Sequence, residues 1–138
     1  MSGYSGTPLP KKLGIKVGFR IALLHAPAEV KAELRDAFKE CRLLKPGAGA
    51  LDFIFLFVMT RAELQHDLEA AARALAPAGM LWISWPKKSS GVTSDLDENI
   101  VRQSGLDAGL VDVKVCAVTE VWSGLKFVIP LKNRSKTK

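Results

Sequence analysis

The feature that most constrains the fold of this chain is the apolar run from Leu51 to Val58, which only Asp52 interrupts. A strand that is covered on both faces has a continuous apolar sequence, whereas a strand with one face in water alternates apolar and polar residues. The run is far shorter than the roughly 20 apolar residues that a membrane span needs. The sequence therefore predicts a central strand of a soluble sheet, with no membrane as a partner.

Further strands and helices surround this run. Apolar residues recur at helical spacing after each of three loops, and shorter apolar segments predict the other strands: Arg20 to Leu24, Cys41 to Leu44, Met80 to Trp85, Val111 to Val118 and Leu125 to Ile129. Strands that alternate with helices form a parallel sheet with helices on both faces. The link before the last strand is too short for a helix, so the last two strands pair antiparallel. We predict an α/β fold: a three-layer, Rossmann-like sheet, mostly parallel, with a C-terminal antiparallel hairpin.

The helix ends carry recognisable signals. Thr60 and Glu63 have the spacing of a capping box, in which each side chain accepts a hydrogen bond from a free N–H group near the helix start. Ser94 with Asp97 suggests a second cap, and the segment from Pro77 to Gly79 predicts the end of the preceding helix. The helices are therefore expected to begin directly after the strands.

The net charge of +6 belongs to the ends of the chain. Residues 1–20 and 132–138 contain only basic charges, while residues 21–131 carry 12 basic and 14 acidic residues. We expect an irregular N-terminal arm over residues 1–12, a single domain over 13–130 and a basic, flexible tail over 131–138. Basic ends can hold nucleic acid weakly and without sequence preference, through charge alone.

Cys41 and Cys116 are far apart in the sequence and belong to no metal-binding motif. Two free thiols suit a reducing compartment, and the N-terminus has no pattern of a signal peptide. We therefore expect a cytoplasmic protein without a metal site.

Several segments resemble a family of short bacterial proteins that has no established activity. They are the Tyr4 to Leu9 segment with Lys11 to Ile15, the Leu81 to Lys88 segment, the Asp107 to Cys116 segment and the Trp122 to Phe127 segment. The resemblance covers about residues 3–129 and implies kinship without a mechanism.

The order of strands is also similar to that of shortened Rossmann-like methyltransferases. Such enzymes bind their cofactor at a glycine-rich turn after the first strand. Here that turn is His25-Ala26-Pro27, without glycine, and Lys45-Pro46 replaces the acid that would hold a ribose. No Asn-Pro-Pro-Tyr motif follows Val58. From the sequence we expect no cofactor, and we consider methyl transfer disfavoured.

The residues that parallel strands bring to one edge are the best candidate for a binding site. Three segments contribute to it: His25; Thr60 and Arg61; and Trp85, Lys87, Lys88, Ser89 and Ser90. These groups include an imidazole, three fixed cations, hydroxyls and an aromatic ring, but no acid. The set favours a phosphate, sulfate or carboxylate, which a helix start would also attract.

No arrangement of nucleophile and base is recognisable, so we assign no catalytic residue. The sequence favours a non-catalytic binding or interaction module, with an anionic small molecule as its ligand. The alternative is a small enzyme that acts on an anionic substrate at the carboxyl edge of the sheet. The N-terminal arm around Tyr4 to Thr7 is an alternative occupant of that edge.

Overall fold

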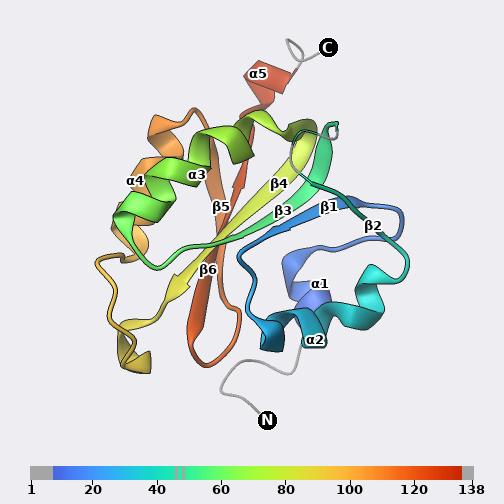
Figure 1. The fold of residues 1–138 in the computed structure, drawn as a ribbon. Coiled ribbons are helices and arrows are strands. Elements are labelled where there is room, and N and C mark those ends of the chain that lie inside the picture. The colour runs from blue at the N-terminus through green and yellow to red at the C-terminus, as the bar shows by residue number, and fades with distance from the viewer. Residues whose placement is uncertain (1–7, 46, 48, 135–138) are drawn as a thin grey trace.

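The computed structural model describes residues 8–45, 47 and 49–134. The elements follow one another in the order α1 (Leu9–Leu13), β1 (Arg20–Leu24), α2 (Ala28–Phe38), β2 (Arg42–Leu43), β3 (Leu51–Phe57), α3 (Arg61–Arg73), β4 (Leu75–Pro86), η1 (Lys88–Ser90), α4 (Glu98–Asp107), β5 (Val111–Ala117), β6 (Trp122–Val128) and α5 (Leu131–Arg134). Helices α1 and α2 pack on one face of the sheet, and α3 and α4 pack on the other (Figure 1). The predicted three layers are confirmed.

The six strands lie in the order β2-β1-β3-β4-β6-β5. Strands β2, β1, β3 and β4 pair in parallel, whereas β6 lies antiparallel between β4 and β5. Because β5 and β4 are both antiparallel to β6, β6 is the one reversed strand in the described part of the sheet. The mostly parallel sheet and its C-terminal antiparallel hairpin therefore agree with the prediction.

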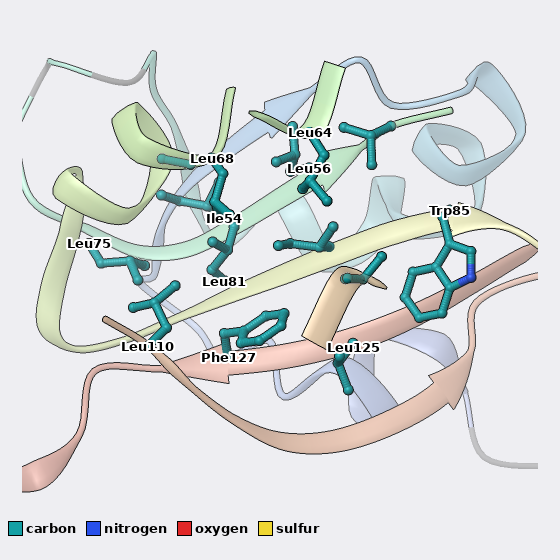
Figure 2. Close-up of a cluster of buried hydrophobic side chains, with 14 of the residues drawn as sticks. Ile54, Leu56, Leu64, Leu68, Leu75, Leu81, Trp85, Leu110, Leu125 and Phe127 are labelled. Atoms are coloured by element: carbon teal, nitrogen blue, oxygen red, sulfur yellow. The ribbon is translucent and has the colours of Figure 1, made fainter. Parts of the chain in front are cut away.

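Strand β3 is central, as its apolar run predicts. Phe53, Phe55 and Phe57 pack toward α1 and α2, while Ile54 and Leu56 pack toward α3 and α4 (Figure 2). All five side chains are at most 2% exposed. Both faces of this strand are thus covered, which explains why its sequence does not alternate.

The expected irregular arm over residues 1–12 is wrong where the structure describes it. Leu9 and Leu13 are one helical turn apart and are both buried, so the short helix α1 packs onto the sheet. The indole N–H of Trp82 donates a hydrogen bond of 3.0 Å to the carbonyl oxygen of Leu13, which fixes the end of α1. Residues 1–7, including the Tyr4 to Thr7 segment, lie outside the described residues.

The tail also begins in a regular element. Residues Leu131–Arg134 form α5, whose Arg134 donates a hydrogen bond of 2.8 Å to the carbonyl oxygen of Ile129. Residues 135–138 lie outside the described part of the chain. The predicted flexible tail therefore differs from the structure over its first four residues.

Two helix boundaries differ from the prediction. Helix α3 ends at Arg73, and Pro77 and Gly79 lie inside β4 instead of stopping the helix. A Cβ atom at Gly79 would be 2.6 Å from the carbonyl oxygen of Leu51, so glycine allows the two strands to approach where their register shifts. Helix α4 is capped by Asp97, which accepts a hydrogen bond from Ile100, and not by Ser94.

None of the helices in the described part of the chain combines the length and the apolar character that crossing a membrane requires. A cytoplasmic location stays a prediction.

Candidate functional site

The order of the strands marks one place on the sheet edge. From β1 the chain adds β2 on one side and then β3 on the other, so the direction of strand addition changes between β1 and β3. In open α/β sheets, ligands bind outside the carboxyl ends of the strands at such a switch point. Here His25 follows β1, and Met59 and Thr60 follow β3. Two of the predicted segments therefore lie at the same switch point.

A hollow of about 640 Å³ lies at this point, and we call it the switch hollow. Its lining residues come from β3, α3, β6 and the segments that follow β1 and β3: His25, Phe57, Met59, Ala62, Glu63, His66, Asp67 and Trp122. The rings of Phe57 and Trp122 meet edge to face with their centroids 5.1 Å apart and form an aromatic wall. The volume is within the range of small-molecule sites, about 300 to 1,000 Å³.

His25 has an unusual backbone conformation. Its φ of +61° makes it the one non-glycine residue with positive φ in the described chain. Glycine adopts this left-handed conformation freely, whereas other residues do so at a cost that is often found at functional sites. The missing glycine in His25-Ala26-Pro27 therefore does not mean a missing turn. The prediction of no cofactor, which rested on the missing glycines, is not tested by this backbone conformation.

The imidazole of His25 lies beside a carboxylate that the sequence did not reveal. Its Nε2 atom is 3.3 Å from Oδ2 of Asp67, and Nδ1 of His66 is 2.9 Å from Oδ1 of the same carboxylate. The side chain of Asp67 is only 20% exposed, whereas those of His25 and His66 are 66% and 87% exposed. Asp67 is thus held between two imidazoles at the mouth of the hollow.

The first turn of α3 is already occupied by acids. Thr60 caps the helix, since its hydroxyl accepts a hydrogen bond of 3.1 Å from the N–H of Glu63. The carboxylate of Glu63 accepts one of 2.7 Å from the N–H of Met59, and Asp95 accepts one of 2.8 Å from the N–H of Arg61. The expectation of an edge without acids was wrong, because Glu63, Asp67 and Asp95 all lie there.

The remaining predicted segment does not join the switch hollow. The short helix η1 consists of Lys88, Ser89 and Ser90. The hydroxyl of Ser90 donates a hydrogen bond of 2.6 Å to the carbonyl oxygen of Lys87. Trp85 is 5% exposed and packs among the buried side chains on the α3 and α4 face (Figure 2). Its ring lies in the core because Trp85 is on the same face of β4 as Leu81 and Ile83, the face that α3 and α4 cover. The buried ring of Trp85 is therefore not available to a ligand at the sheet edge.

A second hollow of about 690 Å³ adjoins the switch hollow at His25, and we call it the basic hollow. Its apolar part comes from β1, α2 and β2, and its cations come from α2 and the segment after β2: Lys31, Arg35, Lys39 and Lys45. No carboxylate is among its described lining residues.

A third hollow, of about 810 Å³, lies elsewhere. It is lined by the last turns of α3 and α4, including Arg73 and Asp107. Both helices begin at the carboxyl edge of the sheet, so their ends lie at the opposite edge, away from the switch point. Within the described ranges, no three His, Cys, Asp or Glu side chains converge to hold a metal ion.

No family model matches the chain, and no curated protein matches it. Solved structures do match. A SAM-dependent methyltransferase from Aquifex aeolicus is 17% identical, with a TM-score of 0.60 over 92% of this chain and 90% of that chain. A putative type 11 methyltransferase from Sulfolobus solfataricus is 16% identical, with a TM-score of 0.56 over 88% and 89%.

The same fold occurs in proteins with other reactions. A protein described as a pericyclic reaction enzyme is 12% identical, with a TM-score of 0.59 over 90% of this chain and 47% of that one. At such identities the comparisons show the fold alone. Our expectation of a non-catalytic module is contradicted by these neighbours, most of which are described as methyltransferases. The chain has a Rossmann-like fold of the kind found in SAM-dependent methyltransferases.

Proposed function

We propose that this chain is a methyltransferase-like enzyme that binds S-adenosylmethionine at the switch hollow. The observation that carries the proposal is the His25–Asp67 pair at the switch point of a methyltransferase-like sheet, where a strained residue follows β1. When bound, this cofactor supplies an electrophilic methyl group on a positively charged sulfur.

The lining of the switch hollow fits the positive charge of such a ligand. Asp67 and Glu63 contribute carboxylates, and Trp122 contributes an aromatic face that attracts cations. The basic hollow lacks the carboxylate that would hold ribose hydroxyls, so the sugar side differs from the usual arrangement. The fit therefore rests on the charged end of the ligand.

His25 can hold a proton during the reaction. The Nε2 atom of His25 lies 3.3 Å from the carboxylate of Asp67, and none of the described residues hydrogen-bonds to Nδ1. Asp67 is then a positioning residue, because its negative charge attracts the Nε2 side of the ring and favours this orientation of His25. The Nδ1 atom of His25 would take the proton from an acceptor hydroxyl or amine.

Calorimetric titration tests this proposal. S-adenosylmethionine should bind saturably, and several-fold more tightly than S-adenosylhomocysteine, which lacks the positive charge on sulfur. Asp67→Asn removes the nearby negative charge and should reduce this preference. Asp36→Asn serves as the control, because Asp36 is an exposed acid on α2 outside both hollows, with 93% of its side chain accessible.

Two results would contradict the proposal. The absence of saturable heat for both ligands at millimolar concentration would exclude the cofactor. Equal affinity for both ligands, unchanged by Asp67→Asn, would exclude the switch hollow as the place where the charged sulfur binds.

A further inference from the structure

Two lysines face each other across the C-terminal hairpin. Lys114 of β5 and Lys126 of β6 are direct partners in the antiparallel register, just after the shift between Asp112 and Lys114. Like charges at directly opposed positions destabilise a pair of strands. This arrangement is therefore unfavourable unless something neutralises it.

The N-terminal segment brings further lysines to the same face of the sheet. The ammonium group of Lys114 donates a hydrogen bond of 3.2 Å to the carbonyl oxygen of Lys12, and that of Lys12 donates one of 2.8 Å to the carbonyl oxygen of Ala117. Burial and the charges of Lys114 and Lys16 hold the pKa of Lys126 below its ordinary value. We call Lys12, Lys16, Lys114 and Lys126 the lysine cluster.

Three of these lysines have no carboxylate as an ion-pair partner in the described part of the chain. Among the described residues, Lys16, Lys114 and Lys126 form no ion pair. The nearest acid in the strand, Asp112, lies opposite Phe127 on the other face, where it accepts a hydrogen bond of 3.0 Å from Arg102. The repulsion between the opposed ammonium groups of Lys114 and Lys126 is therefore not relieved by an ion pair with a described residue.

The lysine cluster is separate from the switch hollow. Lys126 pairs with Trp82, which lies in the middle of β4, four residues before that strand ends at Pro86. Trp82 also contacts α1 through its indole N–H, so the cluster lies on the α1 side of the sheet and not at its carboxyl edge.

We infer that the lysine cluster binds phosphate groups of an anionic ligand. Three elements contribute its cations, and backbone carbonyl groups hold the ammonium groups of Lys12 and Lys114 in place before any ligand arrives. A phosphate oxygen is the partner that relieves the repulsion between opposed ammonium groups, since it accepts charge-assisted hydrogen bonds from several donors. The phosphate belongs either to a small molecule or to a nucleic-acid backbone.

Titrations with pyrophosphate and with a single-stranded oligonucleotide test this inference. The double variant Lys114→Gln with Lys126→Gln should weaken binding at least tenfold. The control, Lys31→Gln with Lys45→Gln, removes the same charge from the basic hollow and should change binding less than twofold. The single variant Lys114→Gln, at an exposed position, gives an independent measurement should the double variant fold poorly.

The two ligands distinguish the sources of phosphate. If a nucleic-acid backbone binds, the oligonucleotide affinity should fall with salt, and the double variant should reduce the logarithmic slope by roughly 1.4, at about 0.7 per phosphate contact. Binding of pyrophosphate alone would assign a small molecule. The inference would be overturned if the control variant lost as much affinity as the double variant. It would also be overturned if neither ligand bound the wild-type protein at millimolar concentration. Neither result bears on binding at the switch hollow.

Discussion

Gly105 lies inside α4 and should not tolerate a methyl group. A Cβ atom at this position would be 2.1 Å from Cε1 of Phe127 and 2.5 Å from its Cζ, whereas carbon atoms in contact are about 3.5 to 4.0 Å apart. Phe127 is fully buried, so its ring cannot move aside into solvent. Overpacking of this kind costs about 1 to 3 kcal/mol. Alanine in a helix interior gains about 1 kcal/mol over glycine.

A clash at 2.1 Å falls at the upper end of this range and exceeds the gain in helix propensity, so we expect Gly105→Ala to lower the free energy of unfolding by up to about 2 kcal/mol. Urea denaturation measures this difference. Phe127→Leu shortens the opposing side chain, so Gly105→Ala should cost much less in that background, as a double-mutant cycle would show. An increase in stability in the wild-type background would refute the reasoning, because helix propensity would then dominate.

Two further predictions concern the N-terminal cap of α3 and the ion pair between Arg20 of β1 and Asp52 of β3. Thr60→Ala removes the acceptor for the N–H of Glu63 and should cost about 0.5 to 2 kcal/mol in urea denaturation, with Thr60→Ser close to wild type. The hydrogen bonds from Arg20 hold the pKa of Asp52 below its ordinary value. Their stabilisation is present above the ordinary carboxyl pKa of about 4 and is lost as the pH falls toward the lower folded pKa. In Asp52→Asn, the free energy of unfolding measured by urea denaturation should therefore fall less steeply as the pH drops below about 4. A fall as steep as that of the wild type would contradict this prediction.

The sequence predicted the central elements well because they depend on local patterns. The Leu51 to Val58 run and the Thr60 cap are each recognisable within one short segment, and both agree with the structure. Gly79 was misread as the end of a helix, because its role depends on the approach of Leu51 from a distant strand. Local signals cannot reveal a contact of that kind.

The site was harder to predict for the same reason. His25 was singled out because it follows a strand, but its partner Asp67 is in the middle of a helix and reads as a surface residue. A signal was nevertheless present: positions 63 and 67 are one turn apart on a helix that begins at the carboxyl edge, so both acids share a face there. Trp85 was expected at the site because it stands at the end of a predicted strand. Its ring is buried instead, and the strand pairing that sets its orientation cannot be recognised from the local sequence.

The central claim is that S-adenosylmethionine binds at the switch point between β1 and β3. Nuclear magnetic resonance of ¹⁵N-labelled protein, titrated with this cofactor, locates the binding site directly. We predict saturable shifts of the amide signals of His25, Ala26 and residues 59–67 and of the indole signal of Trp122, with little change in residues 104–110. Shifts confined to residues 104–110 and 72–73, at the opposite edge of the sheet, or no shifts at millimolar cofactor, would contradict the account.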